Sequence, residues 1–107
     1  MCCANGVRRN SRGKARAIVP VRYVVRGVVQ GVGFRWFVLR EAHRLDVRGW
    51  VTNLPDGSVE VVAAGPTGSL DELWQALRRG PRAAHVSDVE KLDVPHDIVL
   101  PNFFQIK

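Results

Sequence analysis

Apolar side chains recur at every second position near the start of the patterned part of the chain. Val21, Tyr23 and Val25 follow this period, which is typical of a β-strand with one buried face. The pattern predicts a strand over residues 19–29. Two glycines follow in the turn after it, Gly31 and Gly33, and they can adopt backbone angles that other residues disfavour.

After this turn the apolar period changes to that of a helix. Phe34, Phe37, Val38 and Leu45 recur at helical spacing, with charged side chains on the other side. The sequence therefore predicts a helix over residues 34–45.

The middle of the chain reads as a hairpin. Residues 47–54 and 58–64 are rich in β-branched side chains, and Pro55-Asp56-Gly57 lies between them. Proline presets φ and glycine accepts a left-handed position, so these three residues predict a tight turn between two strands.

A second helix follows the break at residues 65–69. Ser69 is predicted to cap it, because Glu72 stands three residues later as in a capping box. Gly80 is expected to end the helix. Its apolar stripe consists of Leu70, Leu73, Trp74 and Leu77.

The rest of the chain predicts a strand over residues 83–94, a loop over 95–101 and a short strand over 103–106. The order β-α-β-β-α-β is that of an α+β, ferredoxin-like sandwich. We expect an antiparallel sheet with two helices on one face, plus a short C-terminal strand. This fold serves many functions, so the function must be argued from the site.

The net charge of +6 is unevenly distributed. Residues 1–18 carry five basic and no acidic residues, a composition typical of a disordered tail. Residues 19–107 are nearly neutral and are expected to form one domain. We therefore expect no specific nucleic-acid partner.

The adjacent Cys2 and Cys3 are interpreted as free thiols on the tail, and we expect a cytoplasmic protein. No apolar run is long enough for a membrane span and no secretory signal is evident. We also expect a monomer.

Three features carry candidate chemistry. The glycine turn leads from a strand into a helix N-terminus, where backbone N–H groups and the helix dipole favour an anion. Arg35 stands at that helix start, where a cation opposes the dipole unless an anion binds there; its planar guanidinium can hold two phosphate oxygens. Asn53 lies near the end of the next strand, and its neutral amide can both donate to and accept from a water molecule.

The histidines, the two carboxylates near the hairpin and the tryptophans are not predicted to take part in catalysis. His43, His85 and His96 show no spacing of metal ligands or of a proton-relay pair, so we expect neither a metal nor a cofactor. Asp56 and Glu60 flank the hairpin turn and are interpreted as solvated side chains, not as a catalytic carboxylate pair. The three tryptophans are interpreted as packing residues: Trp36, Trp50 and Trp74.

Two segments closely resemble the signature motifs of the acylphosphatase family. Residues 27–35, Gly-Val-Val-Gln-Gly-Val-Gly-Phe-Arg, resemble the first, and residues 49–60, Gly-Trp-Val-Thr-Asn-Leu-Pro-Asp-Gly-Ser-Val-Glu, resemble the second. The resemblance covers about residues 19–107. Val28 departs from it, because that position is often polar or basic in the family; so does Leu54, where some members have threonine.

The resemblance implies a free-standing, metal-independent acylphosphatase, which hydrolyses an acyl phosphate to a carboxylate and inorganic phosphate. It implies that Arg35 binds the phosphate and Asn53 orients the attacking water. The phosphate would also meet backbone N–H groups along the loop. These belong to Gln30, Gly31, Val32, Gly33, Phe34 and Arg35.

Alternatives from other classes stay open. A non-catalytic phosphate- or anion-binding module would keep the glycine turn. RNA-recognition domains share the same order of elements but need exposed aromatic side chains on the central strands, where this sequence offers Tyr23 alone. A metallochaperone would need a Cys-x-x-Cys in the first loop, which holds no cysteine. A third alternative is a carbamoyl-phosphate-processing domain, because acylphosphatase-like domains also occur at the start of large hydrogenase-maturation proteins.

Overall fold

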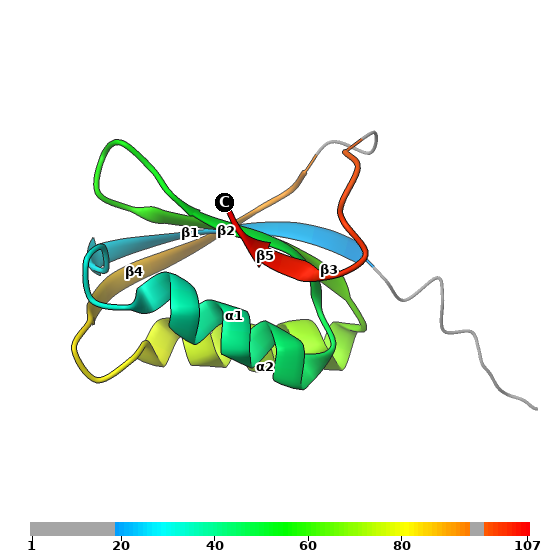
Figure 1. Cartoon of the computed structure of the whole chain (residues 1–107), viewed down its shortest axis with the longest axis horizontal. Helices are drawn as coiled ribbons and strands as arrows, with labels where there is room; N and C mark the ends of the chain where they lie inside the picture. The colour runs from blue at the N-terminus through cyan, green and yellow to red at the C-terminus, as the bar shows by residue number, and fades with distance from the viewer. Residues whose placement is uncertain (1–18, 95–97) are drawn as a thin grey trace, which may run out of the picture.

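The computed structural model describes residues 19–94 and 98–107 of the 107-residue chain. A β-sheet forms one layer, and two helices lie side by side on one of its faces (Figure 1). The expectations for residues 1–18, including the two cysteines, and for His96 lie outside the described residues. The elements are β1 (Val19–Val28), α1 (Phe34–Leu45), β2 (Arg48–Asn53), β3 (Val59–Gly65), α2 (Thr67–Arg79), β4 (His85–Leu92) and β5 (Phe104–Ile106).

The strand order across the sheet is β4-β1-β3-β2-β5. β1 runs antiparallel to both β3 and β4, and β2 runs antiparallel to β3. The predicted ferredoxin-like α+β fold is confirmed. β5 pairs parallel with β2, so the five-stranded sheet as a whole is mixed, and β4 and β5 form its two edges.

The alternation in β1 places every second side chain against the helices. Val21, Tyr23 and Val25 are all buried there. The Tyr23 hydroxyl donates to the carbonyl of Leu70 at 3.4 Å, and its ring packs against Trp74 with 5.6 Å between centroids. Burial, and secondarily the nearby charge of Asp71, raise the pKa of Tyr23 to about 12. Tyr23 is therefore a core residue and offers no exposed ring for stacking on a base.

α1 begins and ends at the predicted residues. Gly33 precedes it with φ of 77° and Asp46 follows it with φ of 60°, so a left-handed residue stops the helical backbone at each end. The apolar face packs into the core shared with the sheet. Its buried members are Phe34, Phe37, Val38, Ala42 and Leu45.

α2 starts earlier than predicted, and the capping role of Ser69 is wrong. The helix begins at Thr67, and the N–H of Leu70 donates to the carbonyl of Pro66 at 3.0 Å. Ser69 thus lies inside the first turn, and no side chain caps the helix. Pro66, with φ of −59° and ψ of 148°, is the last non-helical residue, and its carbonyl accepts the first hydrogen bond of the helix three residues before the position that the Ser-x-x-Glu pattern predicted.

The predicted strand over residues 83–94 is longer than β4. The N–H of Ala84 donates to the carbonyl of Pro81 at 3.0 Å, so the chain is still turning there. The other strands agree with prediction to within one residue at each end. No helix among residues 19–94 and 98–107 is long and apolar enough to cross a membrane.

Candidate active site

The glycine turn leads directly into α1. Gly31 has φ of 75° and Gly33 has φ of 77°, a left-handed conformation that L side chains rarely adopt. A Cβ at either position would meet no atom within 4 Å. These glycines are therefore required by the shape of the backbone and not by crowding.

The backbone N–H groups of this turn are free of protein acceptors. Among the residues that the structure describes, none of the N–H groups from Gln30 to Trp36 donates a hydrogen bond, and the first to do so is that of Phe37, to the carbonyl of Gly33 at 3.0 Å. The first N–H groups of α1 have no intrahelical acceptor, and they carry the positive end of the helix dipole. The turn is thus equipped to bind an anion.

Arg35 is the second residue of α1 and is half-buried. Its guanidinium forms no ion pair with any acidic side chain of the described residues. No acidic residue stands in the first turn of α1. A cation, the helix dipole and free N–H groups therefore lie together with no counter-charge from residues 19–94 or 98–107.

A pocket of about 140 Å³ brings the two predicted catalytic residues together. Since a water molecule occupies about 30 Å³ in the liquid, a tetrahedral oxyanion fits this space. Neither Gln30 nor Val32 lines the pocket, and Val32 packs against the core. The lining residues are Val29, Gly31, Gly33, Phe34, Arg35, Trp36 and Asn53.

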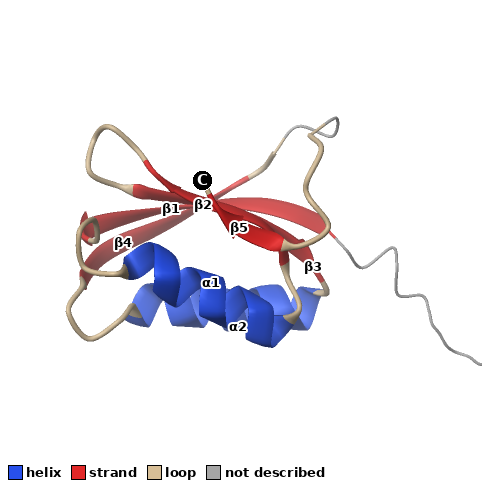
Figure 2. Cartoon of the chain, viewed as in Figure 1, coloured by secondary structure: helices blue, strands red, loops and turns tan. Residues whose placement is uncertain are grey.

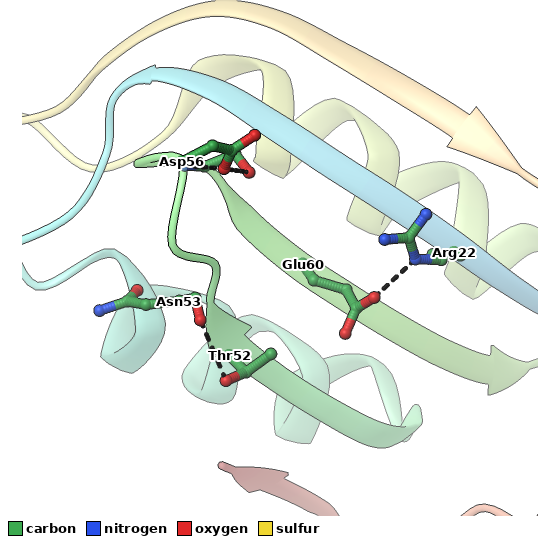
Figure 3. Close-up of polar contacts among 6 residues, drawn as sticks. Arg22, Thr52, Asn53, Asp56 and Glu60 are labelled. Atoms are coloured by element: carbon green, nitrogen blue, oxygen red, sulfur yellow. Dashed lines mark hydrogen bonds and ion pairs between the residues drawn. The ribbon is translucent and has the colours of Figure 1, made fainter.

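Asn53 reaches this pocket from the last position of β2. Figure 3 shows its amide extending away from the strand, toward the start of α1. The hydroxyl of Thr52 donates to the backbone carbonyl of Asn53 at 3.5 Å. No hydrogen bond within the described part of the chain engages the Asn53 side-chain amide, so it can contact a ligand or water.

Gln30 plays a part that the sequence did not indicate. Its side-chain Nε2 donates to the carbonyl of Leu54 at 2.7 Å and to the carbonyl of Ser58 at 2.8 Å. The amide thereby joins the glycine turn to the β2–β3 hairpin, which lies at the same end of the molecule (Figure 2). Both partners are backbone atoms more than twenty residues away, and no side-chain pattern signals such a contact.

The two carboxylates near the hairpin have separate partners; the interpretation of both as solvated holds for Asp56, which is exposed, and is wrong for Glu60, whose side chain is only 19% exposed. Asp56 accepts hydrogen bonds from the Ser58 hydroxyl and from the Ser58 N–H, the latter at 3.0 Å. These bonds hold the pKa of Asp56 below its ordinary value. Glu60 instead pairs with Arg22 at 2.6 Å on the sheet face away from the helices (Figure 3).

The packing interpretation holds for two tryptophans and is wrong for Trp36. Trp74 packs on Tyr23, and Trp50 is half-buried with the Lys107 ammonium 4.3 Å from its ring centroid. Trp36 is 65% exposed beside the pocket. The helical pattern does contain this signal, because Trp36 falls outside the apolar stripe of α1.

The two described histidines, His43 and His85, belong to no cluster of potential metal ligands. His43 is exposed, and its Nε2 lies 3.2 Å from the carbonyl of Phe104. Within residues 19–94 and 98–107, no group of three or more His, Cys, Asp or Glu side chains is placed to hold a metal ion.

The chain matches the acylphosphatase family model over residues 21–106. An acylphosphatase from Burkholderia thailandensis is 52% identical over 81 residues, which cover 76% of this chain and 83% of that protein. One from Koribacter versatilis is 50% identical over 82 residues, covering 77% and 74%. Among solved structures, an acylphosphatase from Coxiella burnetii superposes with a TM-score of 0.79 at 35% identity, covering 88% of this chain and 97% of that one.

Proposed function

The chain belongs to the acylphosphatase family and is a hydrolase, and on that premise we propose that the pocket between the glycine turn and Asn53 is where it cleaves acyl phosphates. In this proposal the turn and Arg35 hold the phosphate, and Asn53 orients water. The juxtaposition of Arg35 and Asn53 on one pocket carries the assignment.

The phosphate is bound by two kinds of donor. The guanidinium of Arg35 forms two parallel hydrogen bonds to its oxygens, and N–H groups between Gln30 and Arg35 surround the others. Positioning and electrostatic stabilisation supply most of the catalysis of phosphoryl transfer. Donors that are fixed in place before the reaction stabilise the charge on the equatorial oxygens without reorganising.

The water is placed by the amide of Asn53, which has no competing hydrogen bond among the described residues. Asn53 holds the water in line with the bond that breaks, between phosphorus and the carboxylate oxygen. The leaving carboxylate is a weak base and departs with the bonding electron pair, needing little protonation. The attacking water passes its proton to a phosphate oxygen, so the products are a carboxylate and inorganic phosphate.

The test is hydrolysis of benzoyl phosphate in EDTA by the wild type, Arg35→Ala, Asn53→Ala and the control Arg40→Ala. Arg40 is exposed on the same helix and lines neither the pocket nor its rim. We expect Arg35→Ala to lower kcat/KM by about 10³-fold and Asn53→Ala by about 10²-fold, with Arg40→Ala unchanged. Inorganic phosphate should inhibit the wild type competitively and Arg35→Ala far more weakly.

Wild-type rates in folded Arg35→Ala or Asn53→Ala protein would refute the role of that residue. An inactive, well-folded wild type that still binds phosphate would instead support the non-catalytic anion-binding alternative. Activity lost in EDTA and restored by a metal ion would overturn the metal-independent mechanism.

We further propose that residues 19–107 form the functional domain, and that it acts as a cytoplasmic monomer without a specific nucleic-acid partner. The nearly neutral charge of these residues supports the last point, as does the burial of Tyr23. Size-exclusion chromatography with light scattering tests the oligomeric state, and fluorescence anisotropy with labelled RNA tests nucleic-acid binding.

A further inference from the structure

A second cavity, of about 440 Å³, runs along α1 next to the phosphate pocket. Arg35, Trp36 and Leu39 line it from the helix, and Phe104 and Ile106 line it from β5. We call it the α1–β5 groove. Its volume lies within the range of small-molecule sites, about 300–1,000 Å³.

The α1–β5 groove adjoins the phosphate pocket. Arg35 and Trp36 line both cavities. Leu39 lies one helical turn beyond Arg35, about 6 Å further along the axis. A group attached covalently to a phosphate at Arg35 therefore has the groove directly beside it.

The walls of the groove suit an apolar group. Besides Arg35, the lining consists of four aromatic or aliphatic side chains, Trp36, Leu39, Phe104 and Ile106, and of the polar His43 and Gln105. The one histidine on its lining, His43, has its Nε2 3.2 Å from the backbone carbonyl of Phe104. Small-molecule sites combine such apolar walls with a few polar groups that fix orientation.

Packing against the core does not explain the presence of Trp36 in the lining of the groove. It is 65% exposed, although indole is among the side chains that gain most from burial. Leu39 and Ile106, by contrast, pack partly against the core. Trp36 thus presents an aromatic surface that lines both the phosphate pocket and the groove.

We propose that the α1–β5 groove binds the acyl part of the substrate, and that Trp36 makes the enzyme prefer acyl phosphates with an aromatic or extended apolar acyl group over acetyl phosphate. The proposal rests on the proposed function, because it takes the phosphate to lie at Arg35. Trp36 determines specificity and takes no part in bond cleavage.

The test compares kcat/KM for benzoyl phosphate and acetyl phosphate in the wild type, Trp36→Ala, Trp36→Phe and the control Trp50→Ala. Trp50 is a half-buried tryptophan that lies on the sheet face away from the helices and outside both cavities. We expect Trp36→Ala to lower the benzoyl-to-acetyl ratio about tenfold, which corresponds to about 1.4 kcal/mol. Trp36→Phe should keep most of the ratio, and Trp50→Ala should leave it unchanged.

A binding measurement separates this inference from the catalytic roles. Calorimetry with benzylphosphonate and methylphosphonate should give the wild type about tenfold tighter binding of the benzyl compound, and Trp36→Ala should lose that difference. If the benzoyl-to-acetyl ratio of kcat/KM and the benzyl-to-methyl ratio of affinity are the same in the wild type and Trp36→Ala, the proposed role of the groove is wrong. Unchanged rates in Arg35→Ala refute the proposed function. If the wild type nevertheless binds benzylphosphonate more tightly than methylphosphonate and Trp36→Ala does not, the groove is still supported.

Discussion

Two turns at the same end of the molecule use their hydrogen bonds in opposite ways. In the β2–β3 turn, the N–H of Leu54 donates to the carbonyl of Ser58 at 2.9 Å and the N–H of Gly57 donates to the carbonyl of Leu54 at 3.1 Å. Asp56 accepts from Ser58 as well. In the glycine turn before α1, the N–H groups donate to no acceptor in the described part of the chain.

This difference in hydrogen bonding indicates different roles for the two turns. A turn that satisfies its own polar groups has little left for a ligand, but it holds its shape. A turn with free donors can bind an anion, but nothing within it fixes the donors in place. The side chain of Gln30 joins the two, so the self-bonded turn holds the open one next to Asn53.

Among the variants that test this comparison, Gln30→Ala is expected to lose the most stability, because it removes the link between the two turns. The carbonyls of Leu54 and Ser58 would lose their shared donor, and the loss should cost about 2 kcal/mol. Thermal denaturation should show Tm lowered by roughly 10 °C, because 1 kcal/mol shifts Tm by about 4–8 °C in a domain of this size. Displacing the turn from Asn53 should also lower kcat/KM about tenfold.

Gln75→Ala is the matched control, because Gln75 is exposed on α2 and forms no hydrogen bond with a described residue. Its Tm and kcat/KM should equal those of the wild type. If Gln30→Ala behaves like Gln75→Ala, the two turns are independent and the comparison fails.

A smaller loss of stability is expected from adding one methyl group to each turn, by Gly33→Ala or Gly57→Ala. Gly33 and Gly57 both have positive φ, 77° and 95°, and a Cβ at either would meet no atom within 4 Å. Alanine should therefore cost each about 1–2 kcal/mol through backbone conformation alone, measured by urea denaturation. Only Gly33→Ala should lower kcat/KM, by about tenfold, because only it displaces N–H groups that face the phosphate. Equal activities in the two variants would contradict the assignment of free donors to catalysis.

The smallest effect is expected from Asp56→Asn. The hydrogen bonds from Ser58 favour the carboxylate, so the pKa of Asp56 is lower in the folded protein than its ordinary value of 3.8. The unfolded chain therefore takes up this proton at a higher pH than the folded protein does. The stabilisation by Asp56 is complete above that ordinary value and is lost as the pH falls through the lower, folded value.

Urea denaturation at about pH 3 and about pH 6 should show a smaller change in the free energy of unfolding for Asp56→Asn than for the wild type. Activity at neutral pH should stay the same, because Asp56 does not line the pocket. A steeper pH dependence in the variant would mean that the hydrogen bonds from Ser58 do not favour the charged form.

The sequence predicted elements best where the local pattern and tertiary packing agree. α1 agrees at both ends, because its apolar stripe and the left-handed Gly33 before it indicate the same boundaries. Ser69 misled the prediction, because a backbone hydrogen bond from Leu70 to Pro66 starts the helix earlier. The parallel pairing of β5 with β2 depends on the direction in which a distant segment returns, which no local pattern records.

The residues of the candidate site likewise differ in how far the local sequence predicts their roles. Arg35 could be named from its local position, because a cation at a helix start is unusual, whereas the roles of Arg35 and Asn53 came from the resemblance of their segments to the family motifs. The pocket of about 140 Å³ brings them together. The exposure of Trp36 could have been predicted, since Trp36 falls outside the apolar stripe of α1. The link from Gln30 could not, since its partners are backbone carbonyls more than twenty residues along the chain.

The strand order also bears on how the protein behaves at high concentration. A sheet edge offers unpaired backbone groups to which a strand of another molecule can add, and charged side chains discourage that addition. β4, one edge, carries the exposed charges of Asp88, Glu90 and Lys91. β5, the other, is only three residues long. Neither edge therefore provides a long, uncharged template for intermolecular β-pairing, which protects the fold against aggregation into extended sheets.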